Sequence, residues 1–499
     1  MEQTTTFLLR LMEILSALFV LAIGIGVLVV IIFYIIDVSQ TSQAIRHNYP
    51  VIGRFRYFFE HLGVFFRQYF FALDREEMPF NRAQRSWVYR AAKGLDSTIA
   101  FGSTRDLHPT GTVLFVNCPF PMLDRDTVHA EPLTIGENCE KPYLAQSIFN
   151  ISGMSYGAIS RPAVLALSNG ARMAGCWMNT GEGGLSPYHL QGGADLVFQI
   201  GTAKYGVRDA QGGLDDERLS NIAAIEQVRM FEIKLSQGAK PGKGGILPGA
   251  KVNEEIARIR GIPPWQDSIS PNRHTDVNNV TDLLNMIERI RRVTQKPVGI
   301  KLVLGAYGWL DEFCHSILQR GIASAPDFIT LDSADGGSGA APMSLMDYVG
   351  LPISESLPML VDKLRQSGLH ERIRVIVSGK LINPAEVAWA LCIGADFITS
   401  ARGFMFSLGC IQALQCNKNT CPTGITTHNP HLQQGLDPRD KAVRVKNYHD
   451  AILHEVGIIA HSCGVDTPRE LRRFHARMVL ENGRSASFDE IYPEVKDGS

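Results

Sequence analysis

The chain has 499 residues, of which 45% are hydrophobic, and its formal net charge is -1. This charge balance and the absence of a basic block exclude the surface that a nucleic-acid-binding protein needs. The length suits about three domains, or one α/β barrel with additions. Nine cysteines, mostly scattered, fit a reducing compartment better than a disulfide framework.

The N-terminal segment is the first predicted element. Ile14 to Ile36 carries no charge over 23 residues, which is long enough to cross a bilayer as one helix. A signal peptide is the alternative, but its apolar core would be shorter and would precede a small-residue cleavage site. One arginine, Arg10, precedes the run, whereas four follow it: Arg46, Arg54, Arg56 and Arg67. The positive-inside rule then predicts a single-pass anchor in the cell (inner) membrane, with the C-terminal bulk in the cytoplasm.

After the anchor, which we assign to residues 1–40, residues 41–105 are predicted to form a helical linker. Phe55 to Phe71 is rich in aromatic residues but also carries charges. It predicts either an amphipathic helix at the membrane surface or an ordinary packing helix. A further helix is expected from Asn81 to Lys93.

Between residues 106 and 430, short β-branched runs alternate with helical stretches, which predicts βα units and a parallel sheet. There are eight candidate strands: Ser147–Ile151, Cys176–Asn179, Leu196–Ile200, Met230–Leu235, Val298–Val303, Asp327–Leu331, Arg374–Val377 and Asp396–Thr399. Eight strands close a TIM-type barrel. The predicted fold class is therefore α/β, a (β/α)8 TIM barrel. A long insertion, Lys240–Arg273, follows the fourth strand. Residues 431–499 form a helical C-terminal extension, with helix expected over 440–481.

Glycine-rich sequences follow six of the predicted strands. They are Ser152-Gly-Met-Ser-Tyr-Gly157, Asn179-Thr-Gly-Glu-Gly-Gly184, Lys234 to Gly245, Asp335-Gly-Gly-Ser-Gly339, Ser378-Gly-Lys380 and Ser400-Ala-Arg-Gly403. In a TIM barrel the functional loops lie at these strand ends, and the loops after the last two strands commonly bind phosphate. Glycine lets backbone N–H groups approach phosphate or a flat flavin. Each run alone also suits an ordinary turn, but six runs at six strand ends predict a cofactor site.

Three cysteines, Cys410, Cys416 and Cys421, stand in one loop with the spacing C-x5-C-x4-C. Thiolates that converge from one loop are suitable ligands for an iron–sulfur cluster. Three ligands suggest a three-iron cluster, or a four-iron cluster with one open iron. The alternatives are buried structural thiols, a zinc site whose fourth ligand is not evident, or chance.

Five motifs together resemble the FMN-binding synthase domain of glutamate synthase. They are Ser152–Ser160, Asn179–Gly184, Glu232–Gly242, Asp335–Ala340 and the three-cysteine loop. The resemblance runs from about residue 140 to 430, and the anchor resembles the small stand-alone members of this family. It implies a (β/α)8 barrel, FMN, and a [3Fe–4S] cluster on Cys410, Cys416 and Cys421. It also implies reduction of 2-iminoglutarate, made from 2-oxoglutarate and ammonia, to L-glutamate.

The resemblance also implies roles for individual residues. Glu182 and Lys240 match catalytic positions, and Lys240, Arg260 and Gln237 match substrate-binding positions. The residues implied to contact the cofactor are Met154, Ser155, Gly157, Asn179, Thr180, Gln199, Lys234, Lys301, Asp335, Gly336, Gly337, Ser378, Gly379, Lys380, Ser400, Ala401 and Arg402.

Four departures from the family pattern bear on function. Lys243 replaces an acid, and Ile246 replaces a glutamine that would hydrogen-bond the substrate, which puts substrate choice in doubt. The seventh loop reads Ser378-Gly-Lys380 where the large synthases have Asp-Gly-Gly. Glu2 stands where a glutaminase domain would place its cysteine nucleophile, so we expect that this chain alone does not take nitrogen from glutamine.

Three functions remain open from the sequence. The first is a membrane-anchored oxidoreductase that makes glutamate, using electrons from ferredoxin or another membrane-linked donor and ammonia that is free or supplied by a separate subunit. The second is a membrane-bound FMN/Fe-S electron-transfer component, and the third a flavin oxidoreductase for another 2-oxo or 2-hydroxy acid. No dinucleotide-binding G-x-G-x-x-G motif follows a strand with an acid downstream, so direct NAD(P)H binding is not expected.

Overall fold

The computed structural model describes residues 2–305 and 307–495. The chain divides into two compact units, Met1–Ala83 and Gln84–Ser499. The first unit contains α1 (Glu2–Ser39), α2 (Ala44–Asn48), α3 (Gly53–Phe66) and a π-helical turn, η1 (Arg67–Phe71). Within α1, the segment Thr6–Ser39 is long and apolar enough to cross a membrane. A segment of this length, composition and position fits a membrane anchor or a signal sequence.

Asp37 joins the three helices of the first unit. Its carboxylate is fully buried and accepts hydrogen bonds from Arg46 Nε (3.0 Å), Val51 N (3.0 Å), Arg54 Nε (2.8 Å) and Arg54 Nη2 (2.8 Å). The Arg54 guanidinium also lies 3.9 Å from the ring centre of Phe33. These charge-assisted contacts hold α2 and α3 against the C-terminal end of α1. The helix predicted over Phe55–Phe71 is present as α3 and η1, and most of its aromatic side chains are exposed.

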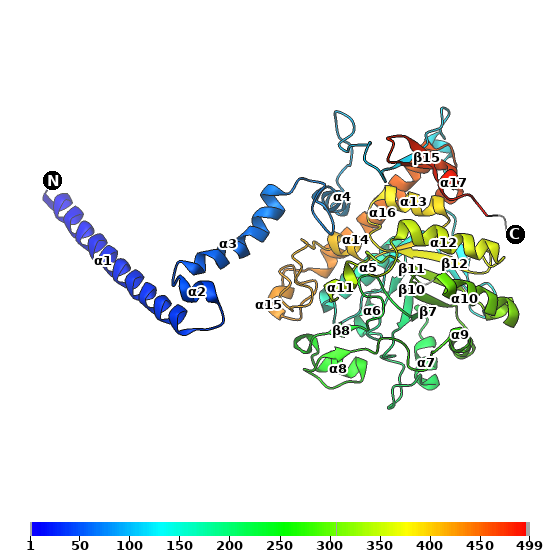
Figure 1. Ribbon diagram of the computed structural model, residues 1–499, viewed down its shortest axis with the longest axis horizontal. Helices are drawn as coiled ribbons and strands as arrows, with labels where there is room; N and C mark the ends of the chain where they lie inside the picture. Colours follow the sequence, from blue (N-terminus) through cyan, green and yellow to red (C-terminus); the bar gives the residue numbers. More distant parts are fainter. Residues whose placement is uncertain (1, 306, 496–499) are drawn as a thin grey trace. The chain divides into compact units, whose positions relative to one another are not determined.

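The second unit is built on a closed barrel of eight parallel strands (Figure 1). In chain order these are β4 (Phe149–Ile151), β5 (Met178–Asn179), β6 (Leu196–Ile200), β7 (Val228–Lys234), β10 (Val298–Val303), β11 (Phe328–Asp332), β12 (Arg374–Ser378) and β13 (Phe397–Ser400). Pairing of β13 with β4 closes the barrel. All eight predicted strands are present, with ends that differ by at most two residues, so the predicted barrel fold is confirmed.

Helices surround this barrel (Figure 1). They include α5 (Arg161–Ala174), α6 (Pro187–Gln191), α7 (Asp216–Ala223), α9 (Val280–Thr294), α10 (Tyr307–Arg320), α12 (Ile353–Gln366), α13 (Pro384–Ile393), α14 (Arg402–Ser407) and the long α16 (Pro438–Ser462). Helix α5 begins at its N-cap Ser160, which accepts a hydrogen bond from Ala163 N, and it ends at Gly175 in the left-handed conformation. Helix α16 packs closely on α5 because Gly170 has no side chain: a Cβ there would lie 2.5 Å from Val445.

The C-terminal region differs from the prediction beyond Ser462. Helix was expected to residue 481, but two short 3₁₀ turns, η5 (Pro468–Glu470) and η6 (Arg473–His475), are followed by strand β14 (Ala476–Val479). This strand pairs antiparallel with β1 (Val113–Phe115) and with β15 (Ser485–Ser487). The extension therefore combines helices with a small sheet, because pairing with the distant β1 overrides the local helical pattern.

Apolar side chains fill the N-terminal end of the barrel. Hairpin strands β2 (Leu133–Ile135) and β3 (Tyr143–Ala145) contribute to a buried cluster there. The ring centres of Tyr143 and Trp177 are 6.2 Å apart, and those of Trp177 and Phe397 are 5.2 Å apart. Since this end is packed with side chains, an open site belongs at the opposite end, where the strands terminate.

Candidate functional site

A cavity opens at the C-terminal ends of the barrel strands, where the glycine-rich loops were predicted to meet. The predicted site residues that line it are Met154, Ser155, Glu182, Gln199, Lys234, Gln237, Lys240, Arg260, Gly337, Ala401, Arg402 and Cys416. An adjoining cavity shares several of these residues and is also lined by Lys301, Ser378, Gly379, Lys380 and Ser400. Loops that are far apart in the sequence therefore enclose one continuous region.

Five predicted cofactor residues line neither of these cavities: Gly157, Asn179, Thr180, Asp335 and Gly336. These residues instead contact the segments that form the cavity walls. Thr180 Oγ1 accepts a hydrogen bond from Gln199 N at 3.1 Å, and Asp335 pairs with Lys380 at 3.4 Å. The Gly157 carbonyl lies 2.8 Å from His428 Nε2. These contacts place Gly157, Thr180 and Asp335 behind the cavity lining.

The predicted insertion Lys240–Arg273 folds into short elements that border the cavity. These are β8 (Ile246–Leu247), η3 (Gly249–Lys251), α8 (Glu254–Arg260) and β9 (Ser268–Ile269), with β8 and β9 paired antiparallel. Asn253 caps α8 by accepting a hydrogen bond from Ile256 N at 2.9 Å, and Gly261 ends the helix with a φ of 67°. The last turn of α8 thereby delivers Arg260 to the cavity wall.

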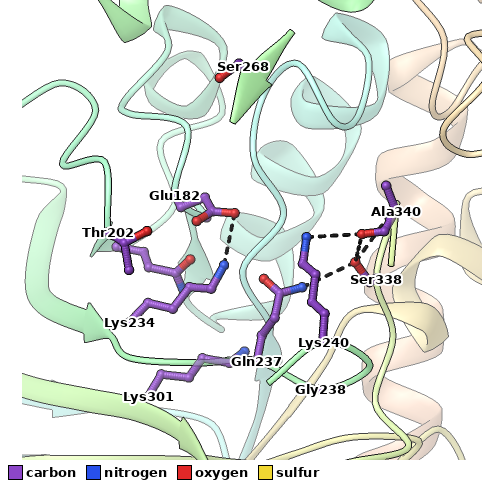
Figure 2. Close-up of polar contacts among 12 residues, drawn as sticks. Glu182, Thr202, Lys234, Gln237, Gly238, Lys240, Ser268, Lys301, Ser338 and Ala340 are labelled. Carbon is purple, nitrogen blue, oxygen red and sulfur yellow. Dashed lines mark hydrogen bonds and ion pairs between the residues drawn. The ribbon is translucent and has the colours of Figure 1, made fainter. Parts of the chain in front are cut away.

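Glu182 and Lys234 face each other at the base of the cavity, with 3.0 Å between Oε1 and Nζ (Figure 2). Burial raises the pKa of the Glu182 carboxyl, but the charges of Lys234 and Lys240 lower it, and the net direction is downward. Glu182 is therefore ionised at neutral pH. Gly245 of the insertion passes directly over this carboxylate, and a Cβ at that position would lie 2.2 Å from Oε1.

Two buried cations beside Glu182 have no carboxylate partner among residues 2–305 and 307–495. Lys240 Nζ donates to the carbonyl of Ala340 at 3.2 Å (Figure 2). Burial and the charge of Lys234 lower the pKa of Lys240 to about 8, although Glu182 opposes this shift. Arg260 donates to Ser268 Oγ at 3.2 Å, and its Nε has no hydrogen-bond partner in the described chain. Buried charges without counter-ions are costly, so this arrangement suits an anionic ligand.

A second group of buried charges lies inside the barrel, and the sequence reasoning did not single out its acids. Glu232 accepts hydrogen bonds from Asn179 Nδ2 (2.8 Å), Gln199 Nε2 (2.6 Å) and Thr330 Oγ1 (2.6 Å). Asp332 lies 3.2 Å from Lys301 Nζ. Burial lowers the pKa of Lys301, but Asp332 and Glu232 raise it, and the net direction is upward, so Lys301 remains charged. The sequence did offer a signal for this group, since Glu232 and Asp332 each stand in an apolar strand. A buried acid needs a partner, so each of them indicates a buried charge pair or hydrogen-bond network.

The three-cysteine loop borders the same cavity through Cys416. Burial raises the pKa of the Cys410 thiol to about 11. Burial also raises the pKa of Cys421, but hydrogen bonds from Thr423 and Thr426 outweigh it and the net direction is downward. In the described part of the chain, no three His, Cys, Asp or Glu side chains are arranged to hold one metal ion. In a multi-iron cluster each thiolate binds a different iron, so the sulfurs need not converge on one point, and this donor set fits such a cluster.

Comparisons with known proteins identify the family. A model of the conserved region in glutamate synthase matches residues 120–466. The chain is 40% identical over 520 residues to the glutamate synthase large subunit-like protein YerD of Bacillus subtilis (strain 168). The alignment covers 96% of this chain and 98% of that protein. The chain is 36% identical over 328 residues to the archaeal glutamate synthase [NADPH] of Methanocaldococcus jannaschii, covering 64% of this chain and 60% of the relative.

Among solved structures, the recombinant flavin-binding domain of baker's yeast flavocytochrome b2 aligns with 83% of this chain and 84% of its own, at a TM-score of 0.46 and 14% identity. The family assignment does not depend on this weak likeness. It follows from the conserved-region match and from the near full-length relative at 40% identity. The chain belongs to the glutamate synthase family of oxidoreductases.

Proposed function

We propose that this protein is an FMN- and iron–sulfur-dependent oxidoreductase that reduces 2-iminoglutarate, formed from 2-oxoglutarate and ammonia, to L-glutamate. The observation that carries the proposal is the pair of buried cations, Lys240 and Arg260, which lack carboxylate partners in the described chain and line the cavity with Glu182. Two cations suit the two carboxylates of a dicarboxylic 2-oxo acid, and the planar fork of arginine suits one carboxylate in particular.

The adjoining cavities have the features that FMN needs. Gly379 has a φ of 117°, and a Cβ there would lie 2.3 Å from the Ser333 side chain, so only glycine lets the loop after β12 turn here. That loop and the one after β13 would hold the phosphate through Lys380, Ser400 and the adjoining backbone. Gln199, Lys234 and Lys301 would face the ring system, where cations and hydrogen bonds tune a flavin. Bound FMN supplies hydride transfer.

The side chains around the substrate have distinct proposed tasks. Lys240 and Arg260 bind and orient the dicarboxylate beside the insertion that borders the cavity. Glu182 is the one carboxylate that we assign to proton transfer. It carries two protons in turn from the nitrogen that adds to the 2-keto carbon to the keto oxygen, the first forming a hydroxyl group and the second releasing it as water, so 2-oxoglutarate and ammonia give 2-iminoglutarate and water. Lys234 holds Glu182 ionised for the first of these transfers.

The second candidate is a membrane-bound electron-transfer component, or an oxidoreductase for another 2-oxo acid. The observation that favours it is Ile246, which lines the cavity where the family has a hydrogen-bonding glutamine. An anaerobic assay separates the two functions. Purified protein with dithionite or reduced ferredoxin, 2-oxoglutarate and ammonium should form L-glutamate. Reduction of the flavin without formation of glutamate, at saturating substrate, would favour the second candidate.

Replacing Cys416 with serine should abolish the iron–sulfur cluster while FMN remains bound. Three ligands hold the proposed cluster, so loss of one thiolate removes a third of its attachment. Iron analysis and electron paramagnetic resonance of mildly oxidised protein measure the outcome. Cys392→Ser is the control, because Cys392 is buried in α13 outside the cysteine loop. Full iron content in the Cys416 variant would show that the ligand assignment is wrong.

The membrane association is part of the same proposal. We assign residues 1–40 to a membrane anchor, 41–105 to a linker, 106–430 to the FMN barrel and 431–499 to the extension. The barrel is then cytoplasmic, where ferredoxin or another membrane-linked donor can reduce it and a separate subunit can supply ammonia. The arginines that follow α1 support this orientation.

Deleting residues 1–40 should move the protein from the membrane fraction to the soluble fraction and leave FMN binding intact. The reason is that every residue of the proposed cofactor site belongs to the unit Gln84–Ser499. Ultracentrifugation and flavin fluorescence after denaturation give the two readouts, with full-length protein as the reference. A truncated protein that is folded and soluble but free of flavin would mean that the first unit completes the site.

A further inference from the structure

Lys251 is a buried lysine that the proposed reaction does not use. It ends η3 in the insertion, and its side chain is 2% exposed. Its Nζ donates to the carbonyl of Ala158 at 2.7 Å and to the carbonyl of Cys416 at 3.2 Å. Ala158 belongs to the loop after β4, so one ammonium bridges the insertion, the first flavin-side loop and the three-cysteine loop.

The surroundings of Lys251 lack a carboxylate partner: within the described residues it forms no ion pair. The charged or titratable groups that act on it are the thiols of Cys416 and Cys421 and the guanidinium of Arg260. His428, which faces Lys251, is neutral, since burial lowers its pKa to about 4. A buried ammonium held only by carbonyls is costly unless an anion lies nearby. Among the described residues, the groups near Lys251 that would supply negative charge are Cys416 and Cys421, once they bind iron as thiolates.

Other contacts tie the same three segments together. Asn419 Nδ2 of the cysteine loop donates to the carbonyl of Ala250 at 3.2 Å. Ser160 N donates to the carbonyl of Ile425 at 2.8 Å. The cysteine loop is thus held by several hydrogen bonds. Two contacts with Cys416 bring a positive charge: Lys251 at its carbonyl and Arg402, whose Nη1 lies 3.9 Å from its Sγ.

We propose that Lys251 is a positioning residue for the cluster held by Cys410, Cys416 and Cys421, and that its positive charge raises the reduction potential of that cluster. The inference rests on the proposed iron–sulfur site. When the cluster accepts one electron its charge becomes more negative by one unit, and a cation in a low-dielectric setting stabilises that reduced form. The hydrogen bond to Cys416 fixes the loop at the same time.

The test is a redox titration of full-length, detergent-purified protein, followed by the electron paramagnetic signal of the cluster. Lys251→Met removes the charge at similar length, Lys251→Arg keeps it, and Lys251→Gln keeps two N–H donors without the charge. Lys418→Met is the matched control, because Lys418 lies in the same cysteine loop but is exposed to solvent. Iron and FMN contents are measured for every variant.

The Met variant should require a potential about 59 mV lower or more for half-reduction, which is a tenfold change in the ratio of oxidised to reduced cluster. The Arg and Lys418→Met variants should stay near the parent value. If the Met variant is isolated without iron, the redox titration is performed on the Gln variant instead. Loss of iron from Met and Gln, but not from Arg, also supports the role of the charge.

Two outcomes would overturn the inference: parental potentials in the Met or Gln variant, or equal loss of iron from all three substitutions at Lys251. Failure of the underlying proposal looks different, because the parent itself would then contain no iron–sulfur cluster. Iron in the parent with an unchanged potential in the variants therefore rejects the role of Lys251 alone.

Discussion

The Lys240→Met variant should bind 2-oxoglutarate roughly 30-fold to several thousand-fold more weakly than the parent and keep its FMN. Truncating one partner of a buried, hydrogen-bonded charge pair costs about 2–5 kcal/mol, and every 1.4 kcal/mol is a tenfold change in affinity. Among the described residues, Lys240 donates a hydrogen bond only to the Ala340 carbonyl, so its charge is available to a substrate carboxylate. Calorimetry on the oxidised protein measures the affinity, and flavin absorbance measures FMN content.

Lys243→Met is the matched control for this variant. Lys243 lies three residues away in the same insertion but is exposed, and screening by solvent makes its charge worth little. We expect parental affinity there. Equal affinities of the Lys240 variant and the parent would exclude Lys240 from substrate binding. Absence of 2-oxoglutarate binding in the parent would instead favour the second candidate function.

The same residue predicts how the affinity changes with pH. Burial lowers the pKa of free Lys240 to about 8, and a bound carboxylate favours the charged form. Affinity for 2-oxoglutarate is therefore full below that pKa and declines as pH rises through 8 and above. Lys240→Arg should remove this decline, because a guanidinium stays protonated throughout. Titrations between pH 7 and 9.5 test this expectation, and an equally steep decline in the Arg variant would assign it to another group.

The Glu182→Gln variant should lose about 10²–10⁴ in kcat for glutamate formation, the usual contribution of a general acid or base. Glutamine keeps the shape but cannot take up and release the proton, whereas the parent carboxylate is held ionised by Lys234 and Lys240. The affinity for 2-oxoglutarate should change far less than kcat, since Lys240 and Arg260 remain. Anaerobic steady-state assays with ammonium and reduced donor separate kcat from KM.

Glu254→Gln is the control for Glu182, because Glu254 is an exposed acid on α8 of the same insertion. Its kcat should equal that of the parent. The Glu182 variant leaves Lys234 without its ion pair, so FMN content and thermal stability are compared as well. A kcat near the parent value in a variant with full FMN would exclude Glu182 from proton transfer and assign that step to water or to a lysine.

Much of the architecture follows from the sequence alone, because its signals are local. The β-branched runs matched all eight barrel strands within two residues, and the uncharged run around Ile14–Ile36 lies inside α1. The strand ends of a parallel barrel all meet on one face, so placing the glycine-rich sequences after strands was enough to predict where the cavity lies. Local pattern and topology agree in this region, and the prediction needed no long-range contact.

Other features were decided only by the tertiary structure. Residues 476–479 form a strand because they pair with β1, which is far away in the sequence. No local sequence pattern predicts this pairing. Glu232 is held in the barrel interior by hydrogen bonds from Asn179, Gln199 and Thr330, which belong to three other strands. Lys251 acquired its position beside the cysteine loop in the same way, through a carbonyl of that loop. Burial and pairing of charges depend on which distant segments the fold brings together, so composition and spacing cannot determine them.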